Sequence, residues 1–319
     1  MADLSNFDAN GAANPNNNIF GLPTTEENSK LVLLTVPWEV TVSYGVGTAR
    51  SPEHLLQASM QVDLFDPDMP GGWKQGFYMR HPEKKILMKS DYLRKEAELY
   101  ISFIAEQEDI SENKFMCKSL KDINQGSDML NNWVYEQSKE LLDKGKLTAL
   151  VGGDHSTPLG FYKALGEKYG SFGILQIDAH CDLRKAFEGF KYSHASVMYN
   201  ALEEIPAISK LVQLGVRDYC EEEWDYVCKS EYRVITYFDQ EVKERQFAGE
   251  TWDHLTDEII NHLPQQVYFS FDIDGLDPKL CPSTGTPVFG GYEAHQILYL
   301  FKKIINRYKS IHIQTHIKT

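Results

Sequence analysis

Short apolar runs alternate with segments of helical periodicity along most of the chain from residue 31 onward. Six of these runs have the length and composition of buried strands, and polar or turn residues bound them. They are LVLLTVPW (31–38), LTALV (147–151), FGILQI (172–177), LVQLGV (211–216), YRVITY (232–237) and QVYFSF (266–271). Because continuous apolar strands separated by helices indicate a sheet that is covered on both faces, we predict a three-layer α/β/α fold with a mainly parallel central sheet.

Two helices have recognisable ends in the sequence. One is predicted to begin at Ser51, where a capping hydroxyl precedes a proline and Glu53 supplies an acid in the first turn. The other is predicted to run from near Ser127 to Asp143, because Gly145 is a typical helix stop.

The first 28 residues differ in composition from the rest of the chain. They are rich in Asn, Gly and Pro and lack periodic apolar positions, which favours a flexible N-terminal arm. No linker or repeat of fixed period follows, so we predict that residues 29–319 form a single domain.

Net charge restricts the class of binding partner, and cysteine content bears on the redox compartment. The 319 residues carry a formal net charge of -14, which disfavours nucleic acid and anionic membrane surfaces and mildly attracts a cationic substrate. The five cysteines include no C-x-x-C pair, so they indicate no disulfide framework and fit a reducing cytoplasm. The sequence contains no apolar run long enough for a membrane span and no signal peptide pattern.

Three of the predicted strands run directly into polar clusters. These clusters are GGDHS (152–156), DAHCD (178–182) and DIDGLDP (272–278). Sites in open α/β sheets form at the carboxyl ends of the strands, so clusters that are far apart in sequence are expected to meet. Each cluster alone is also compatible with a structural turn, built for example on Asp154 or on Asp277.

The spacing within the second cluster favours a metal site. In an extended chain Asp178, His180 and Asp182 share one face, whereas Cys181 points to the other. Burying so many ionisable groups without a cation would cost several kcal/mol per charge. Carboxylate and imidazole ligands suit Mn²⁺, Fe²⁺ or Zn²⁺, and the excess of oxygen favours Mn²⁺. Four aspartate ligands would largely neutralise two divalent ions, which makes a binuclear site chemically reasonable.

Together with STGTP (283–287), the three clusters resemble the signature motifs of the ureohydrolases, the arginase and agmatinase family. The resemblance covers residues 31 to about 305. It implies two Mn²⁺ per chain, with Asp178 and Asp272 bridging them. The full ligand set that it implies is His155, Asp178, His180, Asp182, Asp272 and Asp274. A hydroxide between the ions would attack the guanidinium carbon and release urea and an amine, while Asp182 would orient the hydroxide and pass its proton to the amine.

The segment after the second motif bears on the substrate. LRKAFEGFKYSHASV (183–197) looks most like one prokaryotic branch of agmatinases, which implies that His194 shuttles protons and that Ser193 and Arg184 lie near the substrate. A loop histidine bonded to backbone is the structural alternative for His194. Formimidoylglutamases also carry an arginine at the position of Arg184, so a carboxylated guanidine or amidine ranks second to agmatine, and arginine ranks third.

The C-terminal sequence departs from the family pattern. Family members have a further strand, a Glu that binds the guanidinium and a last helix, whereas SIHIQTHIKT (310–319) alternates like a strand and contains no Glu. We therefore expect a domain shortened at its C-terminus; the alternatives are that the substrate cation is held otherwise or that activity is impaired.

Two other functional hypotheses remain open from the sequence. Binuclear metallophosphatases share Asp-x-His motifs, although their typical Asn ligand motif and a basic phosphate clamp are not found here. A non-catalytic protein that keeps the metal site for stability is the second alternative. The resemblance further implies a homo-oligomer, a trimer or a hexamer, that acts on a small cationic guanidino compound.

Overall fold

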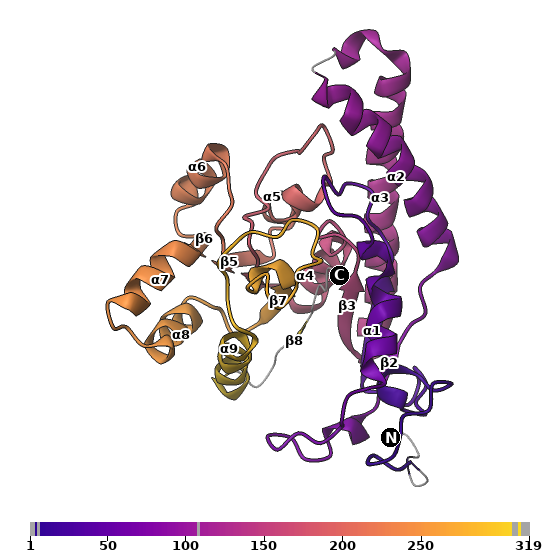
Figure 1. Ribbon diagram of the computed structural model, residues 1–319, viewed down its shortest axis with the longest axis vertical. Helices are drawn as coiled ribbons and strands as arrows, with labels where there is room; N and C mark the ends of the chain where they lie inside the picture. Colours follow the sequence, from indigo (N-terminus) through magenta and orange to yellow (C-terminus); the bar gives the residue numbers. More distant parts are fainter. Residues whose placement is uncertain (1–3, 5–6, 107–108, 308–311, 314–319) are drawn as a thin grey trace.

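The computed structural model describes residues 4, 7–106, 109–307 and 312–313, and its strands form two parallel sheets. One sheet has the order β2-β1-β3 and the other the order β6-β5-β4-β7-β8. β8 also contacts β3, so the two sheets lie edge to edge (Figure 1). The strands are β1 (Leu31–Val36), β2 (Phe77–Met79), β3 (Leu147–Gly152), β4 (Phe172–Ile177), β5 (Ile208–Leu214), β6 (Val234–Tyr237), β7 (Val267–Phe271) and β8 (His312–Ile313).

The six strands expected from apolar runs are confirmed as β1, β3, β4, β5, β6 and β7. The short strand β2 was not predicted, because three residues that pair only with β1 carry too little periodicity to stand out. Of the strand-like segment 310–319, only His312–Ile313 is described, and the rest of that prediction lies outside the described residues.

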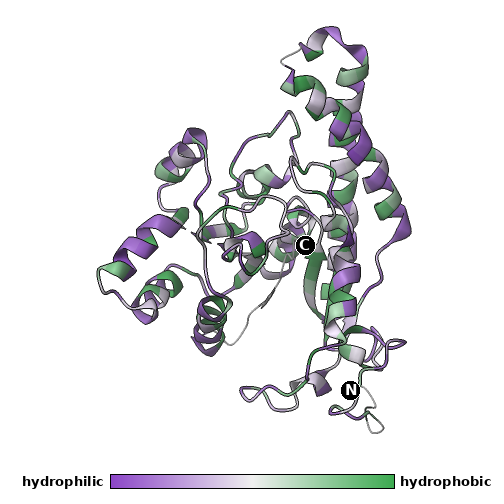
Figure 2. Ribbon diagram, viewed as in Figure 1, coloured by the Kyte–Doolittle hydropathy of each residue, from purple (hydrophilic) through white to green (hydrophobic). Residues whose placement is uncertain are grey.

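Helices cover both faces of the sheet because successive strand residues point to opposite sides. Ile174 packs in one apolar core, whereas Leu175 packs in the other. The green strand β3 lies between helices that mix polar and apolar residues (Figure 2). In the described part of the chain no helix has both the length and the apolar character needed to cross a membrane. The helices are α1 (Ser51–Ser59), α2 (Lys84–Ala105), α3 (Lys114–Asp143), α4 (Leu159–Tyr169), α5 (Val197–Glu204), α6 (Glu221–Lys229), α7 (Asp239–Phe247), α8 (Trp252–Asn261) and α9 (Ala294–Arg307).

Helices α2 and α3 form a long antiparallel pair that projects beyond the sheet (Figure 1). The predicted start of α3 near Ser127 was wrong, because the helix begins at Lys114 after Asn113, whose side chain accepts hydrogen bonds from two backbone N–H groups. Gly126 does not break this helix. A Cβ there would lie 2.2 Å from Leu93 Cδ1 of α2, so the glycine allows the two helices to approach closely. The predicted end of the helix at Asp143 is confirmed.

The predicted helix at Ser51 is confirmed as α1, but the capping role of its hydroxyl was wrong. Ser51 is the first helical residue, and its hydroxyl donates to the Thr48 carbonyl at 2.5 Å. The short 3-10 helix Thr48–Arg50 leads directly into α1, so the chain is already helical before the proline.

The segment from Asn18 onward packs against β2. Asn18 acts as a substitute strand partner, since its side chain accepts from the Met79 N–H at 2.6 Å and donates to the Met79 carbonyl at 3.1 Å. Glu26 forms an ion pair with Arg80 at 2.7 Å. The boundary between an N-terminal arm and the domain stays a prediction.

We expect Asn18→Ala to destabilise the protein, because it removes both hydrogen bonds and leaves backbone groups of Met79 buried without them. The expected loss is about 1–3 kcal/mol in the free energy of unfolding, measured by urea denaturation. Asn16→Ala, at an exposed position in the same segment, is the control and should change stability by less than about 0.5 kcal/mol. Equal stabilities of the two variants would contradict the docking role of Asn18.

Candidate metal centre

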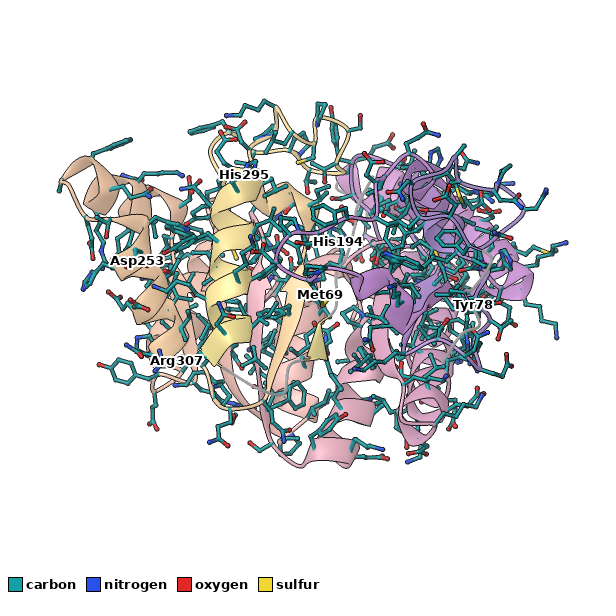
Figure 3. The ribbon with its side chains drawn as sticks, turned by 90° about the horizontal axis from the view of Figure 1, so that it is seen from below. Met69, Tyr78, His194, Asp253, His295 and Arg307 are labelled. Atoms are coloured by element: carbon teal, nitrogen blue, oxygen red, sulfur yellow. The ribbon has the colours of Figure 1, made fainter. Side chains whose placement is uncertain are left out.

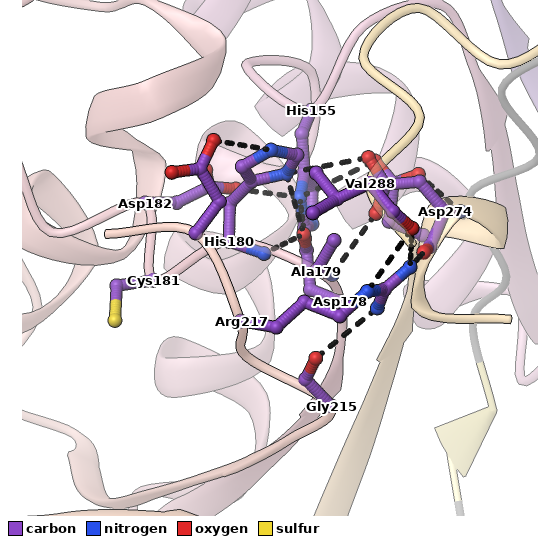
Figure 4. Close-up of polar contacts among 12 residues, drawn as sticks. His155, Asp178, Ala179, His180, Cys181, Asp182, Gly215, Arg217, Asp274 and Val288 are labelled. Atoms are coloured by element: carbon purple, nitrogen blue, oxygen red, sulfur yellow. Dashed lines mark hydrogen bonds and ion pairs between the residues drawn. The ribbon is translucent and has the colours of Figure 1, made fainter. Parts of the chain in front are cut away.

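The three polar clusters meet at the carboxyl end of the sheet, as their sequence positions predict. GGDHS follows β3, DAHCD follows β4, and DIDGLDP follows β7, the direct neighbour of β4. Figure 4 shows side chains from these three loops converging on one point, with His155 and Asp178 at its centre.

His155 is the centre of a first group of ligand atoms. Its Nδ1 lies 2.8 Å from Asp178 Oδ2 and 2.7 Å from Asp182 Oδ2. Asp272 Oδ2 is further away, at 3.7 Å from the same nitrogen. One nitrogen therefore faces three carboxylates from two different strands.

His180 is the centre of a second group, which shares Asp178 with the first. His180 Nδ1 lies 3.3 Å from Asp178 Oδ1 and 3.3 Å from Asp274 Oδ2. Two sets of possible ligand atoms each lie within 4.8 Å of one another, one from His155, Asp178 and Asp182 and the other from Asp178, His180 and Asp274. The two oxygens of Asp178 thus face different histidines, which is the arrangement that a bridging carboxylate requires.

The electrostatics of this cluster favour a cation. The four aspartates 178, 182, 272 and 274 are each at most 4% exposed. Burial raises the pKa of Asp182 to about 6, and the charge of Asp178 adds to this rise. Burial acts to lower the pKa of His155, but hydrogen bonds to Asp178 and Asp182 raise it well above its usual value. Negative charge thus accumulates where water cannot screen it.

Close backbone packing positions the ligands. A Cβ on Gly153 would lie 1.8 Å from the Trp38 carbonyl oxygen, so only glycine fits before Asp154 and His155. Asp182 adopts a left-handed conformation with φ of 55°, which Asp tolerates better than most residues. Its carbonyl accepts hydrogen bonds from the N–H groups of Met198 and Tyr199 at the start of α5, and this holds the turn.

The donor set is composed of oxygen and nitrogen. Cys181 packs in the apolar core, and burial raises the pKa of its thiol, so it is not available as a thiolate ligand. The other ring nitrogen of His155, Nε2, lies 2.8 Å from Ser270 Oγ, which in turn accepts from the Tyr162 hydroxyl. This contact leaves Nδ1 of His155 facing the carboxylates.

A cavity opens beside the ligand cluster and contains two of the three predicted substrate-contacting residues. His194 and Arg184 line it, together with Phe187, Asp218 and Glu223. His194 is 8% exposed, and Figure 3 shows it inside the molecule, whereas Asp253 and Arg307 lie on the outer helices α8 and α9.

The structure does not bring Ser193 into this cavity. Ser193 is fully buried, and its hydroxyl lies 3.2 Å from that of Ser196. Two neighbours in the chain therefore differ, since His194 lines the cavity and Ser193 packs behind it.

Sequence reasoning missed Glu223, which holds the wall of the cavity together. Its two carboxylate oxygens accept hydrogen bonds from the N–H groups of Leu183 and Cys220, each at 3.0 Å. Arg184 lies beside it, with Nε 3.7 Å from Glu223 Oε2. The spacing of Cys220 and Glu223 at the start of a helix is the signal that would have indicated a capping pair.

Arg217 was also missed, and it ties the loop after β7 to the site. Its guanidinium donates to the carbonyls of Gly215, Asp274, Leu276, Val288 and Phe289. Figure 4 shows Arg217 with Gly215, Asp274 and Val288. No sequence signal marks these acceptors, because they are backbone carbonyls that become neighbours only in the folded chain.

A family model described as "Arginase family" matches residues 29–313. The chain belongs to the arginase family. This membership removes the metallophosphatase alternative and makes the chain a hydrolase of the ureohydrolase type, in a family that depends on a binuclear metal centre.

Similar proteins of the arginase family include enzymes with different named substrates. The chain is 28% identical over 280 residues to an N(1)-aminopropylagmatine ureohydrolase of Thermus thermophilus, covering 87% of this chain and 78% of that protein. It is 29% identical over 177 residues to a guanidinobutyrase of Pseudomonas aeruginosa, covering 53% and 52%. The crystal structure of agmatine ureohydrolase of Thermoplasma volcanium superposes with a TM-score of 0.67 at 19% identity, over 92% of this chain and 83% of that one. This confirms the predicted fold.

We expect Glu223→Gln to lower the stability of this arginase-family protein. Glutamine has a single acceptor oxygen, so one of the N–H groups of Leu183 and Cys220 loses its partner. The expected cost is about 1–3 kcal/mol in the free energy of unfolding, measured by urea denaturation. The exposed neighbour Glu222 provides a matched control, since Glu222→Gln should leave stability within about 0.5 kcal/mol of the native protein. A Glu223→Gln protein as stable as this control would refute the role assigned to the carboxylate.

Proposed function

We propose that this protein hydrolyses a guanidino C–N bond of a small cationic substrate, agmatine before others, and releases urea and an amine such as putrescine. The observation that carries the proposal is the position of the shared ligand cluster at the base of a cavity with an acidic wall. Two histidines and four aspartates lie below it, and Asp218 and Glu223 lie beside it.

We further propose that the cluster holds two Mn²⁺. The donors are imidazole nitrogens and carboxylate oxygens, a set that suits Mn²⁺, and four carboxylates balance the charge of two divalent ions. His155, Asp178, Asp182 and Asp272 are assigned to one ion, and His180, Asp178, Asp272 and Asp274 to the other. When bound, the pair of ions supplies a nucleophilic water whose pKa is lowered toward neutrality.

The charge of the cavity wall supports a cationic substrate. The side chain of Asp218 is 68% exposed, and its carboxylate lies 3.9 Å from His180 Nε2. Arg184 is occupied on two sides, by Glu223 and by the ring of Phe187, whose centroid lies 4.9 Å from the guanidinium carbon. A pairing of this kind lowers the capacity of Arg184 to bind a substrate carboxylate. The names of the Thermus and Thermoplasma relatives likewise refer to cationic guanidines.

Two residues are assigned to proton movement. We assign to Asp182 the transfer of a proton from the nucleophile to the leaving amine, because its Oδ2 lies in the ligand cluster at the cavity base. His194 is assigned to proton exchange with the amine. Its backbone N–H donates to Thr41 Oγ1 at 3.1 Å, and its ring packs edge to face with Phe187, so both backbone and ring are held at the cavity.

Arg184 is the observation that favours a second candidate, a carboxylated guanidine or amidine. It lines the cavity, and 36% of its side chain is exposed. The Pseudomonas relative is named for a guanidino acid, guanidinobutyrate. Ser193 contributes to either substrate site only through its packing beside His194. A metal-binding protein without activity is the third candidate.

The assembly and location of the protein are also proposals. We propose a homo-oligomer, a trimer or hexamer, in the cytoplasm.

Release of urea from a substrate panel tests the proposal. With purified protein and added Mn²⁺, we expect kcat/KM for agmatine or N(1)-aminopropylagmatine to exceed that for guanidinobutyrate and arginine at least tenfold, because the wall is acidic and one matched charge contributes about 1.4 kcal/mol or more. Formamide release from formimidoylglutamate is measured in parallel. No urea from any guanidine, despite two bound ions per chain, would support the inactive protein instead.

Removal of Asp178 tests the metal assignment. Because Asp178 faces both histidines, we expect Asp178→Ala to lose both ions, counted by elemental analysis of protein dialysed against Mn²⁺. Asp225→Ala, on the exposed surface of α6, should retain two ions per chain. Two ions in Asp178→Ala would refute the bridging scheme.

A further inference from the structure

A row of polar side chains crosses the core next to the proposed metal centre. Gln176 on β4 is in register with Gln213 on β5, and Gln213 is in register with Thr236 on β6. Both glutamines are fully buried. The residues two positions earlier in these strands, Ile174, Leu211 and Val234, form an apolar row on the same face. The polar row is therefore a local departure from an otherwise apolar layer.

The hydrogen bonds in this row all run in one direction. The Thr236 hydroxyl donates to Gln213 Oε1 at 2.7 Å. Gln213 Nε2 donates to Gln176 Oε1 at 2.7 Å, and Gln176 Nε2 donates to Asp178 Oδ2 at 3.1 Å. Because each amide oxygen already accepts a bond, neither amide can be turned over without placing two acceptors against each other. The row is a chain of aligned dipoles that ends on a carboxylate of the centre.

The row also holds the backbone that carries the ligands. The second hydrogen of Gln213 Nε2 is donated to the Cys181 carbonyl at 2.7 Å, between His180 and Asp182 in the sequence. Gln176 Nε2 lies 3.4 Å from the His180 carbonyl. Gln213, on the strand next to β4, thus contacts both the Gln176 side chain, which bonds Asp178, and the turn after β4.

This arrangement fixes the rotation of the Asp178 carboxylate. Oδ2 accepts from Gln176 and faces His155, whereas Oδ1 accepts from the His180 backbone N–H at 2.8 Å. Each oxygen is therefore directed toward one of the two ligand groups. Fully satisfied buried networks of this kind define one geometry, since every alternative leaves a polar atom unpaired.

We propose that Gln213 is a positioning residue for the binuclear centre, which it acts on through Gln176 and the Cys181 carbonyl, with Thr236 orienting it. The inference rests on the proposed metal site. For the fold alone, an entirely apolar row at positions 176, 213 and 236 would serve equally well, because replacing both partners of a buried polar pair by apolar groups is often neutral for stability. The polar row instead serves the geometry of Asp178, His180 and Asp182.

Manganese affinity separates this role from a merely structural one. The variants are Gln213→Met, which keeps an unbranched side chain of similar size but removes every hydrogen bond, and Thr236→Val, which removes only the outermost donor. Metal-free protein is titrated with Mn²⁺ by calorimetry, and its melting temperature is recorded. We expect Gln213→Met to weaken Mn²⁺ binding about 10–100-fold and Thr236→Val to weaken it less, in the order of their distance from Asp178.

The control is Thr256→Val, the same substitution at a buried threonine of α8 whose hydroxyl donates to the Asp253 carbonyl. It should lower the melting temperature without changing Mn²⁺ affinity. In Gln213→Met, activity lost at limiting Mn²⁺ should return when Mn²⁺ is raised about 10–100-fold, with KM for the substrate unchanged.

These measurements distinguish a failure of the positioning role of Gln213 from a failure of the proposed metal centre. Native Mn²⁺ affinity in both Gln213→Met and Thr236→Val would overturn the positioning role and leave the proposed function intact. An equal loss of affinity in Thr256→Val would overturn it as well, since the effect would then follow from stability. Native protein that binds no Mn²⁺ would overturn the proposed centre and this inference together.

Discussion

The repulsion among four buried carboxylates is the constraint on which the rest of this structure depends. Asp178, Asp182, Asp272 and Asp274 arrive from two neighbouring strands and lie around two histidines, almost without exposure to water. Such a cluster is tolerable only with compensating charge, which the histidines supply in part and a pair of divalent cations would complete. Membership of the arginase family, whose members depend on two metals, agrees with this physical requirement.

Much of the surrounding architecture holds these carboxylates in place. Gly153 lets the loop after β3 approach Trp38, so that His155 reaches the cluster. Arg217 ties the backbone of Asp274 to the loop at 288–289, and the buried glutamine row ends in a hydrogen bond to Asp178. These contacts come from different strands and loops. The geometry of the centre is therefore a property of the whole carboxyl edge of the sheet.

The cavity beside the centre combines acidic and basic groups. The way these groups pair decides how much charge is left to attract a substrate. The Glu223 carboxylate accepts hydrogen bonds from two backbone N–H groups and lies beside Arg184. The charges of Glu223 and Arg184 are therefore largely compensated within the cavity wall. Asp218 is the more exposed carboxylate. This distribution is the physical basis on which we propose a cationic guanidine as the substrate.

The sequence by itself determined the layered parallel fold, because buried strands and amphipathic helices have distinct periods. It also indicated the ligand cluster, since ligands at alternate positions after three strands must face one edge. Tertiary structure alone decided which partners those residues have. The sequence contains Ser193 beside His194, but only packing separates a cavity residue from a buried one. The roles of Arg217 and Gln213 likewise follow from contacts with carbonyls and amides far away in the chain, which no local pattern encodes.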